Sequence, residues 1–309
     1  MAYETQVRDA DALEPCRGFI LLAVLWIIGA LATLAMIYAL YVHETFVDFV
    51  EHDERLQAQA LAISGVELAI YQLTKDPNTR PVEGQFTFVQ GNATVAVTFS
   101  SENSRIDLNL APRELIEGLL TGLGVQPDEA SSYTDRIVAW RTPLKTGQSD
   151  AEEQRYQEAG KTYGPRHGPF QHPEELALVA DMPGSLFNRI MPYVTVYSGR
   201  PEVNVLAASP QVLAALPEMT PDRLQLLLAL RQAGPQAVAR AQLGAAASSI
   251  TLDDSRTNRV AIDIQFDSGR RMHKEAVVML MDRDSEPYRI VWWSDRTPPA
   301  SDSLDVGIR

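Results

Sequence analysis

Residues 19–42, FILLAVLWIIGALATLAMIYALYV, contain no charged side chain. An α-helix rises about 1.5 Å per residue, so this stretch would be about 36 Å long and would cross a hydrocarbon core of about 30 Å. The apolar core of a secretory signal peptide is shorter, and a core helix of a soluble protein usually keeps a polar face. We therefore predict a membrane-inserted helix over residues 19–42.

The charged residues on the two sides of this helix differ in sign. Arg17 precedes it, and five acidic residues follow it: Glu44, Asp48, Glu51, Asp53 and Glu54. Basic flanks tend to stay in the cytoplasm. We expect a single-pass protein with a short cytoplasmic N-terminus and a large C-terminal body on the other side of the membrane.

The composition limits the function classes. The chain has 309 residues, of which 45% are hydrophobic, enough for about two domains. Its net charge is −13, and the first eighteen residues carry −2, which leaves −11 for the rest. Such an acidic body repels nucleic-acid phosphate. The single cysteine, Cys16, precedes the apolar run, so no disulfide framework is available.

The helix continues beyond the membrane. Residues 43–74 contain no proline and carry apolar residues at spacings of three and four. We expect one helix over residues 19–74, with a length of about 80 Å. Asp76-Pro77-Asn78 ends it.

Alternating apolar and polar residues predict five β-strands. They cover residues 85–90, 93–99, 260–266, 275–281 and 288–293. The first two flank the turn Gly91-Asn92 and form a hairpin. We expect an α+β fold in which residues 43–103 and 243–296 build one antiparallel sheet on the amphipathic helix. An all-α domain over residues 104–242 interrupts this sheet, and residues 297–309 form a disordered tail.

Two parts of the helical block resemble each other. Residues 106–130 and 202–225 each hold a short β-like stretch, a proline that opens a helix, and a second helix start at a proline. The matched positions are Asp107 and Asn204, Pro112 and Pro210, and Pro127 and Pro221. Residues 172–197 repeat the helix–turn–helix rhythm and end in a β-like run.

Signatures of common enzyme classes are not visible in the sequence. The five histidines form no HExxH pattern, and no cysteine–histidine set suits zinc. No P-loop, complete GxGxxG or GxSxG motif is found. We therefore expect a protein that is not an enzyme.

Residues 120–130, LTGLGVQPDEA, resemble a helix-hairpin-helix turn, whose glycines allow backbone amides to approach DNA phosphate. Glu117, Asp128 and Glu129 lie close by in the sequence. Because these acids disfavour phosphate, we prefer a purely structural helical hairpin.

Residues 146–156, TGQSDAEEQRY, could offer calcium ligands through Asp150, Glu152 and Glu153. Ser149-Asp-Ala-Glu152 is also a capping box, which places acids where a helix N-terminus favours them. The capping interpretation is the stronger one from the residues alone.

The junction of Gly18 and Phe19, directly before the apolar helix, resembles the class III signal of type IV pilins and pseudopilins. The resemblance implies that a prepilin peptidase removes residues 1–18 at the cytoplasmic face and that Phe19 is methylated. The helix would then stay in the inner membrane until it enters a fibre core. The acidic leader departs from the usual basic leaders of this family.

The fifth mature position is Ala23, where the family usually has glutamate. This departure resembles the K-type minor pseudopilins of type II secretion systems (general secretion pathway protein K). Further similar stretches are SRIDLNLAP, RIVAWRTP, GPFQHPEELALV, IMPYVTVYSG and VNVLAASPQVLAAL. The chain departs from this family at Leu206, which often is asparagine, and in a short loop between Trp140 and Tyr156.

The resemblance implies a minor pseudopilin at the tip of a periplasmic pseudopilus. Its implied partners are the I-type and J-type minor pseudopilins and the major pseudopilin, and it raises the expectation of calcium at the 146–156 loop. No nucleic acid is expected. The alternative hypothesis is a membrane-tethered helix-hairpin-helix protein that binds DNA in an uptake system, which depends on residues 120–130.

Overall fold

A computed structural model describes residues 17–76, 80–144, 151–239, 244–281 and 286–295. The chain forms two compact units, Met1–Gln59 and Ala60–Arg309. Most of the predicted leader and the predicted disordered tail over residues 297–309 lie outside the described residues. The unit boundary falls inside a helix and differs from the domain limits expected from the sequence.

Helix α1 (Arg17–Thr74) is 58 residues long, as the absence of proline predicts. Within the first unit, Leu21–Tyr41 has a mean hydropathy of 2.4 and no buried residue. Trp26, for example, is 77% exposed. A continuous apolar surface of this length is suited to lipid, which needs no polar face on the helix.

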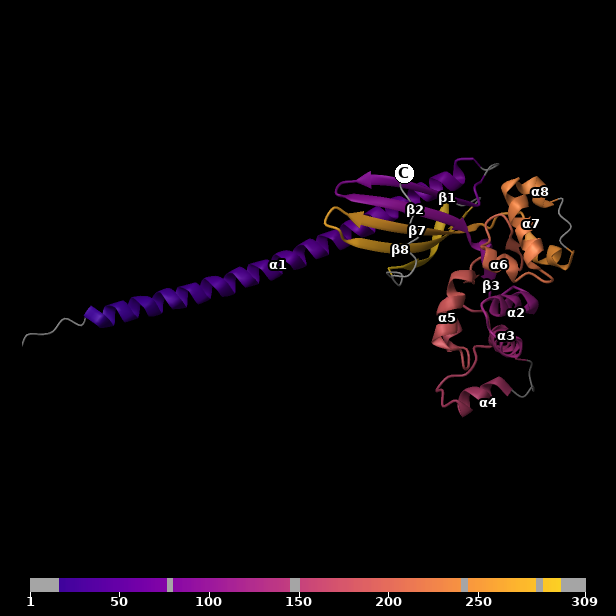
Figure 1. The fold of residues 1–309 in the computed structure, drawn as a ribbon, viewed down its shortest axis with the longest axis horizontal. Helices are drawn as coiled ribbons and strands as arrows, with labels where there is room; N and C mark the ends of the chain where they lie inside the picture. Colours follow the sequence, from indigo (N-terminus) through magenta and orange to yellow (C-terminus); the bar gives the residue numbers. More distant parts are fainter. Residues whose placement is uncertain (1–16, 77–79, 145–150, 240–243, 282–285, 296–309) are drawn as a thin grey trace, which may run out of the picture. The chain divides into compact units, whose positions relative to one another are not determined.

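The sheet of the second unit has the order β1-β2-β7-β8-β9, and Figure 1 shows its first four strands labelled side by side. The strand bounds are β1 Glu83–Gln90, β2 Ala93–Ser101, β7 Thr257–Phe266, β8 Arg271–Leu280 and β9 Tyr288–Ser294. All neighbouring pairs are antiparallel. The five predicted strands and the α+β class are therefore confirmed, including the turn between Gln90 and Ala93.

The second part of α1 packs on this sheet. Its buried residues are Leu61, Ala62, Val66, Ala69, Ile70 and Leu73. A side chain at Gly65 would meet Val97 of β2 at 3.1 Å and Ile262 of β7 at 3.4 Å, so the glycine permits a close approach of helix and sheet. Tyr288 of β9 donates a hydrogen bond to Glu67 on the flank of the helix.

The chain leaves the sheet after β2 and returns to it at β7, its neighbour. The helical segments between them are η1 Glu102–Ser104, α2 Arg113–Gly122, α3 Pro127–Arg141, α4 Ala151–Glu158, η2 Pro173–Leu178, α5 Gly184–Ile190, η3 Met191–Tyr193, α6 Pro210–Ala214, α7 Pro221–Gln232, α8 Pro235–Ala239 and η4 Gly244–Ser249. An inserted helical block is therefore present as the sequence predicts, but the expectation of an all-α domain over residues 104–242 is wrong in two respects: the block contains four short strands, β3 to β6, and it extends to Thr251.

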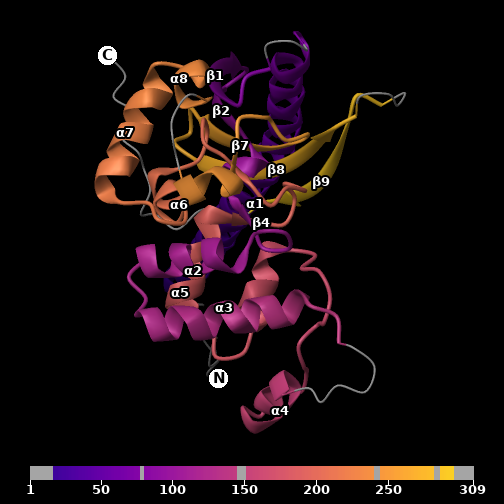
Figure 2. The same cartoon turned by 90° about the vertical axis from the view of Figure 1, so that its right-hand side faces the viewer.

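Two short parallel strand pairs divide the block into two lobes. In lobe 1 (residues 106–195), β3 (Ile106–Asp107) pairs with β4 (Val194–Thr195). In lobe 2 (residues 203–251), β5 (Val203–Asn204) pairs with β6 (Ile250–Thr251). Each lobe thus begins and ends at its strand pair, with helices between; Figure 2 shows α2 and α3 of lobe 1 and α6 and α7 of lobe 2.

The two lobes touch where α2 meets the end of α6. A side chain at Gly118 would lie 2.2 Å from the carbonyl oxygen of Ala215, so α2 and α6 touch at this point. The absence of a side chain at Gly118 therefore permits the close packing of the two lobes.

Candidate functional site

The predicted processing residues lie at the start of α1. Gly18 and Phe19 belong to the first turn of the helix, and Ala23 lies in the apolar span Leu21–Tyr41. No structural feature tests cleavage between Gly18 and Phe19. The helix does continue through this junction, so the residues after Gly18 retain helical backbone.

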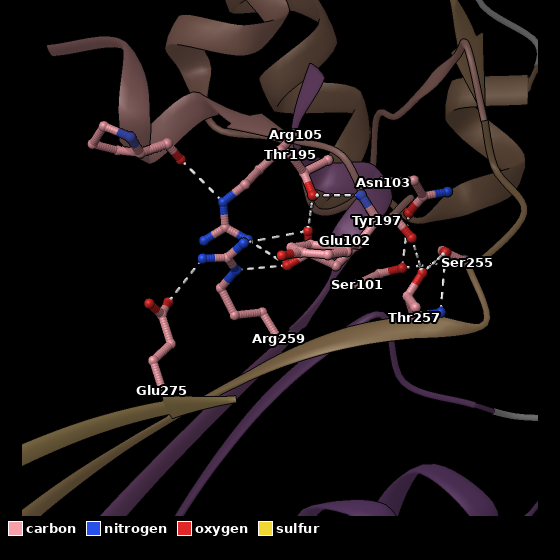
Figure 3. Close-up of polar contacts among 11 residues, drawn as sticks. Ser101, Glu102, Asn103, Arg105, Thr195, Tyr197, Ser255, Thr257, Arg259 and Glu275 are labelled. Atoms are coloured by element: carbon pink, nitrogen blue, oxygen red, sulfur yellow. Dashed lines mark hydrogen bonds and ion pairs between the residues drawn. The ribbon is translucent and has the colours of Figure 1, made fainter. Parts of the chain in front are cut away.

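A buried ionic cluster joins lobe 1 to the sheet. Glu102, directly after β2, is fully buried. Arg259 of β7 donates to Glu102 Oε1 through Nε at 2.6 Å and contacts Oε2 through Nη2 at 3.4 Å. Arg259 also contacts Glu275 of β8 at 3.3 Å, and its guanidinium lies 5.4 Å from the ring centre of Trp292. Figure 3 shows this cluster.

Lobe 1 supplies the other contacts to the same carboxylate. The Thr195 hydroxyl of β4 donates to Glu102 Oε2, and Arg105 contacts Oε1 at 3.4 Å. Arg105 also donates through Nε to the carbonyl of Pro192 at 3.0 Å. Burial alone would raise the pKa of Glu102, but Arg259, Arg105 and Thr195 together lower it. Glu102 therefore stays ionised and ties β2, β4 and β7 together.

A second set of hydrogen bonds closes the return crossing to the sheet. Ser255 Oγ donates to the carbonyl of Ser198 at 3.0 Å, and the Thr257 hydroxyl donates to the carbonyl of Tyr197. Asn103 Nδ2 donates to the carbonyl of Asp253 at 2.9 Å. The chain therefore leaves and re-enters the sheet at one polar junction (Figure 3). Hydrogen bonds within this junction satisfy most of its buried donors and acceptors.

Each lobe starts with the same hydrogen-bonded turn. The side chain of Asp107 accepts from the amide of Asn109 at 2.9 Å, and that of Asn204 accepts from the amide of Leu206 at 2.9 Å. The carbonyls of Asp107 and Asn204 each accept from the amide four residues on, also at 2.9 Å. The matched residues found in the sequence are therefore the turn-forming residues of the two lobes.

An arginine at the end of the second helix closes each turn. Arg141 of α3 donates to the carbonyls of Leu108 and Ala111 at 2.7 and 2.8 Å. Arg231 of α7 donates to the carbonyl of Ala208, the position that matches Ala111, at 2.8 Å. Sequence comparison of residues 106–130 with 202–225 missed this pair because both arginines lie beyond those segments.

The helix-hairpin-helix turn of residues 120–130 exists, with Gly124 at φ +84° between α2 and α3. The matching residue of lobe 2 is Glu218, at φ +55°. A carboxylate at this position and the acids at the start of α3, Asp128 and Glu129, repel phosphate. These turns shape the lobes, and the geometry gives the DNA-binding alternative no support.

The candidate calcium ligands are only partly described. Asp150 lies outside the described residues, while Glu152 and Glu153 lie in the first turn of α4. Glu152 lies 3.7 Å from Arg155. Among the described side chains no group of three acids, histidines or cysteines could hold a metal ion. Two glutamates fall short of the six to eight oxygen ligands of calcium, so the calcium site stays a prediction.

Sequence reasoning missed Glu102 and Arg259 as a pair. They lie 157 positions apart, and Glu102 reads as an ordinary polar residue after a strand. One signal was present: Glu102 and Arg105 place opposite charges at the exit from a predicted strand. Only the antiparallel register of β2 and β7 brings Arg259 to that exit.

An apolar N-terminal helix that continues into a helix packed on an antiparallel sheet defines the class of pilin-like proteins. In this chain a helical insertion lies between two neighbouring strands of that sheet. Comparison with known proteins narrows this class.

Residues 96–199 match the family model of type II secretion system (T2SS) protein K. The type II secretion system protein K of Klebsiella pneumoniae is 27% identical over 238 residues, which cover 68% of this chain and 72% of the relative. A chain in the crystal structure of the GspK-GspI-GspJ complex from enterotoxigenic Escherichia coli has the same fold, with a TM-score of 0.59 and 15% identity. The match covers 80% of this chain and 98% of that one.

These matches make the chain similar to protein K of type II secretion systems and support the role of a minor pseudopilin in secretion. This confirms the resemblance stated from the sequence. The DNA-uptake alternative finds no support in these comparisons. The N-terminal apolar helix is suited to anchoring the protein in a membrane.

Proposed function

We propose that this chain is a non-enzymatic minor pseudopilin that caps the tip of a periplasmic pseudopilus together with I-type and J-type pseudopilins. The observation that carries the tip position is Ala23 in the apolar span. A subunit without a carboxylate there has no acid to pair with the N-terminal amine of a subunit ahead of it. The two lobes between β2 and β7 add bulk that other subunits would have to accommodate.

Co-purification tests the partners. Full-length tagged chain, expressed with its I-type and J-type counterparts and extracted in mild detergent, is expected to elute as a three-way complex. The matched control is a variant with Ala23→Glu, which gains the missing carboxylate. We expect this variant to contact the major pseudopilin at positions within the pseudopilus that the wild-type chain does not occupy. Elution of the wild type without either minor pseudopilin would contradict the proposal.

We propose that the mature chain starts at a methylated Phe19. Intact-mass spectrometry of the membrane-extracted protein is expected to show loss of residues 1–18 and one added methyl group. Gly18→Val, which adds a branched side chain at the cut, should retain the leader. A wild-type protein that still starts at Met1 would rule out this processing.

The proposed topology has residues 1–18 in the cytoplasm and the second unit in the periplasm. Because Cys16 is the single cysteine, a Cys16→Ser background makes cysteine labelling selective. Thr98→Cys, on an exposed position of β2, should then react with a membrane-impermeant maleimide on intact spheroplasts. Protection of Thr98→Cys until the membrane is lysed would reverse the topology.

We propose that Asp150, Glu152 and Glu153 contribute to a calcium site, since the resemblance favours this loop although their described geometry gives no ligand set. Calcium should then raise the unfolding temperature of the full chain, and magnesium should not. Replacing the three acids with Asn, Gln and Gln should abolish the shift. An equal response of wild type and triple variant would eliminate the site.

A further inference from the structure

A fully buried asparagine lies near the start of β7 with its amide group unpartnered. Asn258 is 0% exposed. Within the described residues, neither its Oδ1 nor its Nδ2 atom has a hydrogen-bond partner. Buried amide groups are rarely left in this way, because a buried donor or acceptor that makes no hydrogen bond destabilises the folded state. The position therefore offers both an acceptor and donors in the protein interior.

A third unpartnered atom lies close to this amide. Asn258 is the register partner of Ser101 on β2, so the two side chains are neighbours on one face of the sheet. The amide of Ser255 donates to Ser101 Oγ at 3.2 Å and to Asp254 Oδ1 at 2.9 Å. The Asp254 carboxylate therefore lies beside the Ser101 hydroxyl. Its other oxygen, Oδ2, is buried and has no hydrogen-bond partner in the described part of the chain.

The surroundings restrict what could satisfy these three atoms. Ser101 and Asn258 are 0% exposed and Ser255 is 2% exposed, so a ligand must be small. A metal ion would suit the two oxygens but would leave Nδ2 without an acceptor, and an anion would be repelled by both oxygens. Water donates and accepts hydrogen bonds, and a buried water typically makes about three of them to polar groups of this kind.

We propose that Asn258 and Asp254 hold buried water, which accepts from Asn258 Nδ2 and donates to Asp254 Oδ2. The residue before Asp254 is part of the attachment of lobe 2, because the carbonyl of Asp253 accepts from Asn103 and Asn204 at 2.9 and 3.2 Å. The bound water would thus connect β7 to the segment on which lobe 2 returns to the sheet. This inference is independent of the proposed function.

The sign of one substitution tests the proposal. Asn258→Leu keeps the branched shape of the side chain and removes both polar atoms. The leucine would displace the water and leave Asp254 Oδ2 unsatisfied, so we expect about a tenfold loss in the folding equilibrium constant of the full chain. Urea unfolding in detergent measures it. If the amide binds no water, its removal eliminates two unsatisfied groups, and a variant more stable than the wild type would overturn the proposal.

Asp254→Ala separates the loss of bound water from overpacking by leucine, because it removes the oxygen that the leucine would leave unsatisfied. In this background the loss caused by Asn258→Leu should shrink to about threefold or less. Val260→Leu is the matched control, since Val260 is the next residue on the same face of β7, is 0% exposed and has no polar side-chain atom. Its effect should be the same in both backgrounds. An equal loss for Asn258→Leu in both backgrounds would also overturn the proposal.

A high-resolution crystal structure of the full chain identifies the ligand directly. The wild type should show a rounded density peak at about 3 Å from Asn258 Nδ2 and Asp254 Oδ2, and Asn258→Leu should lack it. A direct hydrogen bond between the two side chains would contradict the bound water. Contacts of about 2.4 Å to several oxygens would contradict it as well, because they indicate a calcium ion.

Discussion

Lobes 1 and 2 use one backbone design with different side-chain chemistry. Both start with a turn-forming residue, close with an arginine from the second helix and end in a parallel strand pair. Lobe 1 uses the charged Asp107, which accepts from the hydroxyl of Ser198 at 2.8 Å. Lobe 2 uses the neutral Asn204, which donates to the carbonyl of Asp253 at 3.2 Å. The repeat thus preserves hydrogen-bond geometry, while each lobe fits the charge to its own neighbours.

The lobes also differ in how they attach to the sheet. Lobe 1 is joined through Thr195 to the fully buried Glu102. Loss of one partner of Glu102 would leave a buried charge uncompensated. Lobe 2 contacts the sheet through Arg231 and Glu83, and the side chain of Glu83 is 56% exposed. Solvent-exposed ion pairs contribute little to the free energy of unfolding. Lobe 1 is therefore the lobe that fixes the insertion on the sheet.

The largest effect is expected where the two lobes touch. In Gly118→Val the new side chain would lie 2.2 Å from the carbonyl oxygen of Ala215, and a backbone atom cannot yield as a flexible side chain can. We expect a loss of about 3 kcal/mol or more in the free energy of unfolding. Urea unfolding of the detergent-solubilised chain measures it.

Gly122→Ala is the matched control in the same helix, because nothing lies within 4 Å of the added side chain. It should be neutral or stabilise by about 0.5 kcal/mol. Equal unfolding midpoints for the Gly118 and Gly122 variants would show that the lobes do not pack through this contact.

Exchanging the turn chemistry should have the next largest effect. In Asn204→Asp a carboxylate oxygen replaces the amide that donates to Asp253, so two acceptors face each other at a fully buried position. We expect a loss of about 2–3 kcal/mol at pH 7. The loss should shrink near pH 4, where the new acid takes up a proton. A pH-independent loss would show that shape, rather than charge, decides the residue at this position.

Removing the closing arginines should distinguish the lobes by number of contacts. Arg141→Met leaves two carbonyls without their donor, and Arg231→Met leaves one. We expect losses of about 2 and about 1 kcal/mol, respectively. Thermal unfolding of the two variants, compared under identical conditions, gives the order. The reverse order would mean that the contact of Arg231 with Glu83 contributes more than its exposure implies.

The sequence alone was sufficient for the elements whose signal is local. The α1 helix, the hairpin at Gly91-Asn92 and the three later strands follow from periodicity and turn residues. The similarity around Asp107 and Asn204 was also visible, because turn-forming side chains act within four residues of themselves.

The contacts that hold the lobes in place could not be read in this way. The pairing of Glu102 with Arg259 depends on strand register across the whole insertion. The role of Gly118 depends on a packing contact with a helix almost a hundred residues away, and a glycine within a helix carries no such information. Turns and helices formed by residues close in sequence could be predicted. The contact partners of Glu102, Arg259 and Gly118 depended on the topology of the chain.

The smallest effect concerns Asp107 itself. Burial raises its pKa, although hydrogen bonds from Ser198, Asn109 and Gly199 oppose this. The folded state therefore holds its proton more tightly than the unfolded state. The stability that this proton contributes is fully present below the unfolded pKa, near 4, and is lost as pH rises through the folded pKa.

Asp107→Asn removes this titration but keeps an oxygen for the amide of Asn109. Its amide group would face the amide of Gly199, which now donates to the carboxylate at 3.2 Å. We expect the variant to lose about 1 kcal/mol at pH 4 and less at pH 7, because the wild type alone loses stability over that range. Urea midpoints at pH 4, 5.5 and 7 measure this. A gap that widens toward pH 7 would show that ionised Asp107 is favoured in the folded lobe, so that lobe 1 tolerates a charge that lobe 2 avoids.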